Sequence, residues 1–76
     1  PGALDSLTKE MLYLAVSVTN QCPYCIASHT VGARNKGMSE AMFTELMAVL
    51  GLANQNNSLV AGYQVEIDEA FKSAAK

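Results

Sequence analysis

Apolar residues recur at helical spacing along most of the chain, and this pattern predicts an all-α fold. The first helix is expected over about residues 5–20, with Asp5 or Ser6 as its N-terminal cap. One face of this segment is formed by Leu7, Met11, Leu14, Ala15 and Val18. Leu12 and Val16 lie on nearly the opposite side. A helix that is apolar on two sides is covered by more than its own small domain, so the pattern indicates a subunit interface.

A second helix is predicted to begin at the Cys22-Pro23 pair and to run to about Asn35. Proline is favoured at the first helical position, because its missing N–H has no partner within the helix there. Cys22 is then the expected N-cap residue. Gly37 is expected to end this helix as a residue in the left-handed conformation.

A third helix is predicted to begin after Ser39, a good N-cap residue, and to continue towards Tyr63. Its apolar stripe consists of Met42, Leu46, Val49, Leu50 and Ala53, with Phe43 and Met47 beside it. The polar run at residues 54–57 is a weak helix former and predicts a break or kink. Residues 63–67 alternate between apolar and polar side chains, so an extended segment is an alternative there. Asp68 is the expected cap of a short terminal helix.

The chain length of 76 residues predicts a single domain over residues 1–76. Domains this short bury only about 60% of the surface of the unfolded chain, and many need a disulfide, a metal or a partner subunit. Half of the residues are hydrophobic, so we expect a homo-oligomer. The sequence starts at Pro1 without an initiator Met, which is consistent with a domain that lacks N-terminal residues.

Charge and hydropathy exclude two classes of partner. The net charge is −2, the pI is about 5.1 and the five basic residues form no patch, so we expect no nucleic acid. We expect no membrane partner either, since no apolar run reaches the length of a bilayer span and no signal peptide is visible. Two cysteines without export features favour the reducing cytoplasm. A close cysteine pair there is more often catalytic or metal-binding than structural.

The candidate chemistry lies in Cys22, Cys25 and His29. Residues three and four apart on a helix are neighbours, so these three side chains are expected to stack along one face. The partial positive charge at the helix N-terminus favours the thiolate, which is the reactive form of cysteine. His29 follows Cys25 by one turn and can exchange a proton with it directly or through water. Two thiols and a base make a redox site that needs no metal and no organic cofactor.

Two other interpretations of the cysteine pair stay open. The pair could be a purely structural disulfide, but a bond between Cys22 and Cys25 closes a very short loop and would therefore stabilise the fold only weakly. Cysteine and histidine are also normal zinc ligands, although structural zinc sites usually draw their ligands from two separated segments. A metal-binding or purely structural helical module is therefore the alternative to a thiol oxidoreductase.

Glu10 enters the site through a resemblance to a known family. Glu10, Cys22, Cys25 and His29 together read E-x(11)-C-x-x-C-x-x-x-H. This pattern closely resembles the active-site signature of AhpD-like alkylhydroperoxidases, in the carboxymuconolactone decarboxylase superfamily. Flanking residues at 14–17, 25–27 and 37–39 are also similar to the small members of that family, and the resemblance extends over roughly residues 7–71. Without it, Glu10 is only a carboxylate at the border of an apolar helix face.

The resemblance implies a compact all-α subunit that assembles into trimers or hexamers and reduces alkyl hydroperoxides. In the family's scheme Cys25 would attack the peroxide and Cys22 would close the disulfide. His29 and Glu10 would relay protons, with Glu10 acting on the Cys22 side. An external thiol or dithiol reductant would then regenerate the site.

Two further comparisons with the family refine this prediction. Family members that lack the cysteine pair are decarboxylases, so the pair argues against that chemistry here. The family's peroxidase carries a histidine directly before its second cysteine, whereas this chain has Tyr24. The broader term thiol oxidoreductase therefore describes the expected activity better than peroxidase.

Overall fold

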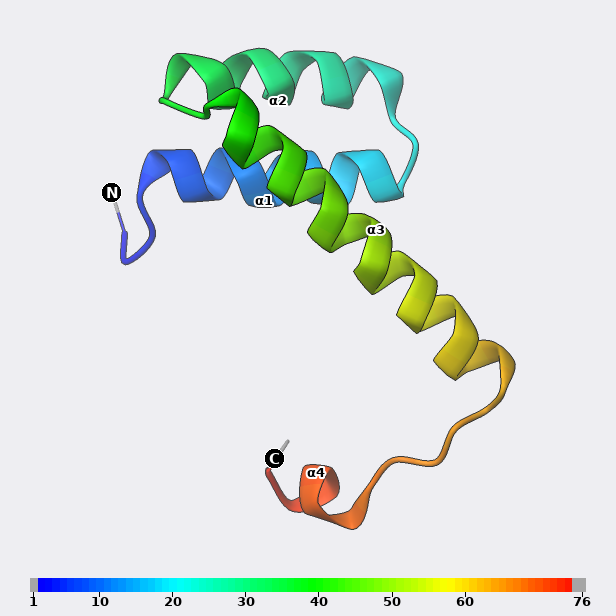
Figure 1. The fold of residues 1–76 in the computed structure, drawn as a ribbon. Helices are drawn as coiled ribbons and strands as arrows, with labels where there is room; N and C mark the ends of the chain where they lie inside the picture. Colours follow the sequence, from blue (N-terminus) through cyan, green and yellow to red (C-terminus); the bar gives the residue numbers. More distant parts are fainter. Residues whose placement is uncertain (1, 75–76) are drawn as a thin grey trace.

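The computed structural model describes residues 2–74, and all regular secondary structure within that range is helical. Helix α1 spans Ser6–Thr19, α2 spans Pro23–Asn35, α3 spans Glu40–Gly62 and α4 spans Glu69–Ala74 (Figure 1). The prediction of an all-α fold is confirmed. The predicted domain also includes residues 1, 75 and 76, which lie outside the described residues.

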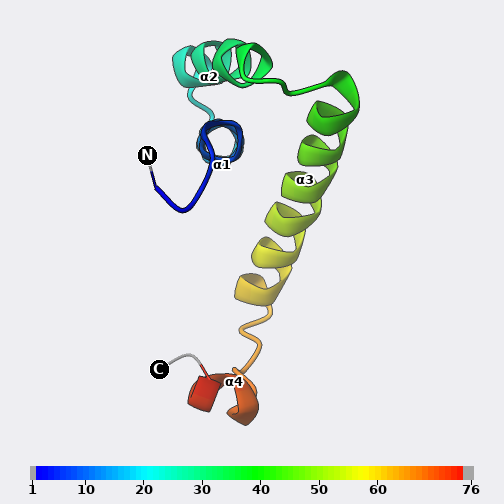
Figure 2. The same cartoon turned by 90° about the vertical axis from the view of Figure 1, so that its left-hand side faces the viewer.

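Helices α1 and α2 lie side by side and antiparallel, and α3 crosses α1 obliquely (Figures 1 and 2). The buried core within residues 2–74 consists of Leu14 from α1, Ala33 from α2 and Met38 from the turn after α2. Partly buried residues surround them: Leu7, Met11, Val18, Ile26, Met42, Phe43 and Leu46. Leu14 belongs to the predicted apolar face of α1, whereas Leu12 and Val16, on nearly the opposite side, are exposed.

The starts of the first three helices follow the sequence closely. The Asp5 carboxylate accepts a hydrogen bond from the Thr8 N–H at 2.7 Å, and Ser39 Oγ accepts one from the Met42 N–H at 3.1 Å. The N-cap of α2 is Cys22, with Pro23 at the first helical position. Each cap satisfies a backbone donor that the first turn of a helix leaves without a partner.

The same three helices end in Schellman motifs, in which a left-handed residue lets the chain turn back on the last helical carbonyls. Gly37 ends α2 in this way, with φ +108°, as predicted. The corresponding residues after α1 and α3 are Gln21 and Gln64, with φ near +55°, a conformation that costs a residue with a side chain about 1 kcal/mol. The backbone bonds of Cys22 N–H to Ser17 O and of Val65 N–H to Val60 O, both 3.1 Å, close the two glutamine turns.

The predicted break at residues 54–57 is wrong, because α3 continues without interruption to Gly62. Poor helix formers cost less than about 0.7 kcal/mol each, which one further backbone bond per residue outweighs once a helix exists. Asn54 also donates from Nδ2 to Thr19 Oγ1 at 3.0 Å, which ties this part of α3 to the end of α1. Residues 63–68 are irregular, and α4 starts directly after Asp68.

The subunit is elongated, so the expectation of a compact subunit is wrong. Its Cα radius of gyration is 15.3 Å, whereas a compact domain of this length would have about 11 Å. The second half of α3 extends beyond α1 and α2, and within residues 2–74 helix α4 packs against none of the other helices (Figures 1 and 2). No helix in that range is long and apolar enough to cross a bilayer.

Candidate active site

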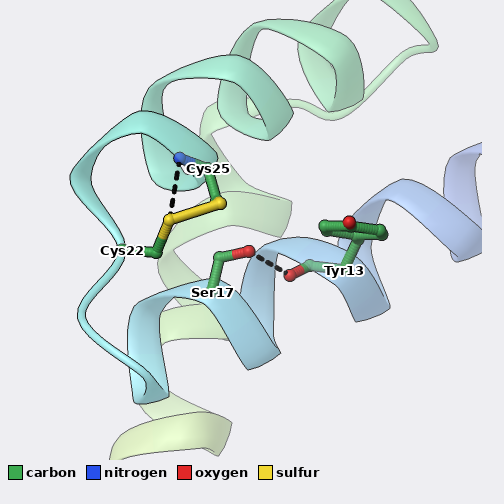
Figure 3. Close-up of a disulfide and its surroundings, with 4 residues drawn as sticks. All are labelled: Tyr13, Ser17, Cys22 and Cys25. Carbon is green, nitrogen blue, oxygen red and sulfur yellow. Dashed lines mark hydrogen bonds between the residues drawn. A yellow bond between two sulfur atoms is a disulfide. The ribbon is translucent and has the colours of Figure 1, made fainter.

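The turn between α1 and α2 sets the position of the first cysteine. Gln21 is left-handed, and the Cys22 N–H therefore bonds back to Ser17 O at the end of α1. Cys22 then caps α2 directly, without an intervening loop. One short turn thus brings the first turn of α2 over the last turn of α1, with the cysteines facing Ser17 (Figure 3).

Cys22 and Cys25 form a disulfide, with their Cα atoms 5.3 Å apart. Both residues are partly buried, and the Cys25 N–H donates to Cys22 Sγ at 3.3 Å. The sulfur of Cys22 therefore occupies the capping position at the positive end of the helix. A thiolate formed there would be stabilised by this N–H and by the helix dipole.

Glu10 and His29 form an ion pair or hydrogen bond across the two helices, with 2.8 Å between Oε2 and Nδ1. Both side chains are about three-quarters buried, at 23% and 24% exposure. An ionised carboxylate can only accept, so Nδ1 carries the proton and the opposite nitrogen, Nε2, is left to exchange protons. The carboxylate therefore orients the imidazole one helical turn after Cys25.

Tyr13 and Gly32 complete this arrangement, and sequence reasoning missed both. The Tyr13 ring stacks on His29, with ring centroids 3.8 Å apart and an interplanar angle of 25°. Gly32 leaves room for the carboxylate of Glu10, since a Cβ atom on Gly32 would lie 2.8 Å from Oε2. The available signal was spacing, because each residue follows a predicted site residue by three positions on the same helix.

A groove of about 470 Å³ runs along α1 beside the disulfide. Two neighbouring rows of α1 side chains and the cysteine pair line this groove. The first row is Lys9, Tyr13 and Ser17, and the second is Leu12, Val16 and Asn20. The cysteines are Cys22 and Cys25. The Ser17 hydroxyl is buried and donates to Tyr13 O at 2.7 Å, so it fixes the wall beneath the sulfurs (Figure 3). A substrate in this groove could reach the disulfide directly.

The predicted site residues therefore fall into two pairs. Cys22 and Cys25 line the groove, whereas Glu10 and His29 lie outside its lining. Tyr13 contacts both parts, since it lines the groove and stacks on His29. Tyr24 is 84% exposed and lies outside the groove lining as well. In the described part of the chain, no three His, Cys, Asp or Glu side chains are grouped so that they could hold a metal ion.

Similar proteins are known at the level of sequence and at the level of structure. The chain is 56% identical to the alkylhydroperoxidase AhpD core from Rhodospirillum rubrum, with a TM-score of 0.91, over 93% of this chain and 52% of that chain. A Paracoccus denitrificans protein described as uncharacterized protein 4 in the cox locus is 42% identical over 48 residues, which are 63% of this chain and 43% of that protein. The chain thus spans about half the length of the proteins it matches.

The family model of the carboxymuconolactone decarboxylase family matches residues 1–65, which are most of the chain. The AhpD core structure has the same helical arrangement over nearly all of the chain, so the resemblance inferred from Glu10, Cys22, Cys25 and His29 is confirmed. The chain belongs to the carboxymuconolactone decarboxylase family and has an AhpD-like fold.

Proposed function

We propose that this chain is a thiol-dependent oxidoreductase that reduces hydroperoxides through a dithiol–disulfide cycle of Cys22 and Cys25. The observation that carries the proposal is the disulfide at the N-terminus of α2, which lines an open groove one helical turn from a histidine oriented by Glu10. A dithiol, an access route and an oriented base are the requirements of thiol-based peroxide reduction.

In the first step the Cys25 thiolate attacks one peroxide oxygen, and the O–O bond breaks. Cys25 becomes a sulfenic acid, and the other oxygen leaves as an alcohol after it takes up a proton. We assign to His29, one helical turn after Cys25, the roles of taking the proton from the Cys25 thiol and delivering it to the leaving oxygen. The sulfur loses two electrons and the peroxide gains them.

In the second step the Cys22 thiolate attacks the sulfur of the Cys25 sulfenic acid. The new S–S bond is the disulfide of the structure, and hydroxide leaves and takes up a proton to form water. The Cys25 N–H, 3.3 Å from Cys22 Sγ, stabilises the attacking thiolate. Cys25 follows Cys22 by only three positions along the chain, so no conformational change is needed to bring the two cysteines together.

Glu10 is a positioning residue in this proposal. It contacts His29 rather than the sulfurs, so its effect on either cysteine is transmitted through the imidazole. Tyr13 restricts the same ring from its flat face. These two contacts hold the proton carrier in one orientation before the peroxide arrives.

An external thiol or dithiol must reduce the disulfide after each turnover. Its thiolate attacks one sulfur, the other leaves as a thiolate, and a second external thiol releases the reduced site. Such reductants are kept reduced in the cytoplasm, the compartment expected from the cysteine content.

We further propose that the functional unit is a homo-oligomer of this single domain. The arm, defined as residues 51–74, exposes seven large hydrophobic residues: Leu52, Leu59, Val60, Tyr63, Val65, Ile67 and Phe71. A second apolar groove, of about 430 Å³, lies between α1 and α3 and is lined mostly by Met11, Leu12, Met42, Leu46 and Val49. A core of three buried residues is too small to stabilise a chain of this length, so the arm of another copy is the occupant that we propose for this groove.

Peroxide consumption coupled to the loss of two thiols per subunit tests the redox proposal. The wild type is reduced, freed of reductant and mixed with cumene hydroperoxide. Cys25→Ser should abolish turnover, and Cys22→Ser should stop the cycle at the sulfenic acid, which a sulfenic-acid reagent would trap on Cys25. Unchanged turnover in Cys25→Ser refutes the assignment. Stoichiometric zinc in the purified protein, with thiols that resist oxidation, would support the metal-binding alternative instead.

Sedimentation velocity tests the oligomer. We expect the wild type to sediment as a trimer or hexamer, and Phe71→Asp with Ile67→Asp to dissociate it. A stable folded monomer of the wild type at micromolar concentration contradicts the proposal.

A further inference from the structure

The groove beside the disulfide has a reactive end and a charged end. Cys22 and Cys25 lie at the C-terminal end of α1, next to Ser17, whereas Lys9 lines the groove two helical turns earlier (Figure 3 shows the reactive end). Ser17 follows Lys9 by eight positions on α1, which corresponds to a rise of about 12 Å at about 1.5 Å per residue. A ligand that reaches both ends must therefore be elongated.

The wall between the two ends is apolar. Tyr13 and Val16 line this part of the groove and are more than half exposed, at 57% and 59%. Leu12, at 54% exposure, lines both this groove and the one between α1 and α3. Side chains of this size that stay exposed next to a reactive sulfur offer a surface on which an alkyl chain gains free energy by leaving water. The middle of the groove thus favours a hydrocarbon chain over a compact polar substrate such as hydrogen peroxide.

Lys9 is available for a ligand. The ion pairs formed within residues 2–74 join His29 to Glu10, Arg34 to Glu40 and Lys72 to Glu69. Lys9 takes part in none of them, and its side chain is exposed. An ammonium group at the far end of an apolar groove is complementary to an anionic group at the end of an alkyl chain.

We infer that the preferred substrates are hydroperoxides of long-chain carboxylic acids, with the carboxylate at Lys9 and the peroxide at Cys25. This inference rests on the proposed function and narrows its substrate class. With single bonds of about 1.5 Å in a zigzag chain, about ten carbon atoms span the distance between the two groups. The redox step is unchanged: the hydroperoxide becomes the corresponding hydroxy acid, and the carboxylate takes no part in the chemistry.

The test compares linoleic acid hydroperoxide with its methyl ester, which has the same chain and the same peroxide but no negative charge. We expect the KM of the acid to be about two- to fivefold lower than that of the ester, because this is the change in affinity that one solvent-exposed ion pair provides. Lys9→Gln should equalise the two KM values, Lys9→Arg should keep the difference, and added salt should reduce it. The matched control is Lys36→Gln, which removes an equal charge at the C-terminal end of α2. This variant should keep the difference in KM between acid and ester.

A binding measurement separates this inference from the proposed function. Dodecanoate carries the chain and the charge but cannot be reduced, and its binding to the oxidised protein can be followed by the NMR signals of the Leu12 and Val16 methyl groups. If those signals shift with dodecanoate in wild type but much less in Lys9→Gln, the groove assignment stands even when no peroxide is turned over. If acid and ester have equal KM values, or if dodecanoate binding is insensitive to Lys9→Gln, the inference is overturned.

Discussion

Gly32 offers a substitution whose effects on stability and on activity should have opposite signs. It lies within α2, where alanine is more favourable than glycine by about 1 kcal/mol because glycine loses more conformational freedom on folding. The new Cβ atom would lie 2.8 Å from Glu10 Oε2. The obstacle is thus the far end of a flexible side chain, which can move without disturbing the backbone.

The carboxylate must move by about 0.6 Å to restore an ordinary contact of 3.4 Å with the new methyl group. That movement lengthens or misaligns the 2.8 Å contact with His29 Nδ1. A misplacement of about 1 Å can cost about a hundredfold in rate, so a loss of about tenfold is expected for Gly32→Ala. The melting temperature should stay equal or rise, by at most about 4–8 °C if the full gain of about 1 kcal/mol that alanine adds to the helix is realised.

The assay is a single turnover of the reduced protein with cumene hydroperoxide, followed by the loss of free thiols, together with thermal unfolding of the same samples. Gly51→Ala is the matched control, because Gly51 also lies inside a helix but has no atom within 4 Å of its would-be Cβ. Gly51→Ala should gain similar stability and keep the wild-type rate.

A Gly32→Ala rate equal to that of wild type would show that the alignment of Glu10 with His29 does not limit disulfide formation. A slow variant that is also less stable than wild type would show that the cost is structural. Only the combination of a slower reaction and unreduced stability supports the positioning role of Glu10.

Three other substitutions test separate parts of the structure. Glu10→Gln should slow disulfide formation by about tenfold or more, because a neutral amide holds His29 less firmly, and an unchanged single-turnover rate would remove Glu10 from the mechanism. Leu14→Ala should lower the free energy of unfolding, measured with urea, by about 2–5 kcal/mol, because Leu14 is fully buried. Leu4→Ala, at a half-exposed position, should lower it little, and similar losses in the two variants would contradict the observed core. The Thr8 N–H donates to Asp5 and holds the pKa of that carboxyl below its ordinary value of 3.8. Asp5 therefore stabilises the fold above that pH and loses this effect as the pH falls through the lowered pKa, so Asp5→Asn should flatten the acid side of a melting-temperature profile.

The sequence by itself determined the helices and the cysteine chemistry, because these depend on neighbours within one or two turns. Cys22 is an N-cap next to Pro23, and Cys25 and His29 follow on the same face, so local geometry alone brings them together. The glycine that ends α2 was predictable for the same reason, since its left-handed conformation suits glycine best. The ends of α1 and α3 were harder to foresee, because glutamine takes the left-handed position there.

Only the tertiary structure decided what surrounds this local arrangement. Glu10 reaches His29 because α1 and α2 pack antiparallel, and the size of Gly32 permits that contact, neither of which helical spacing can show. The path of α3 past residues 54–57 depends on its cooperativity as a long helix and on the contact of Asn54 with Thr19, not on local propensity. The groove that ends at Lys9 likewise exists only where α2 lies against α1. Local interactions therefore placed the sulfurs, and helix packing supplied the base, its partner and the surface beside them.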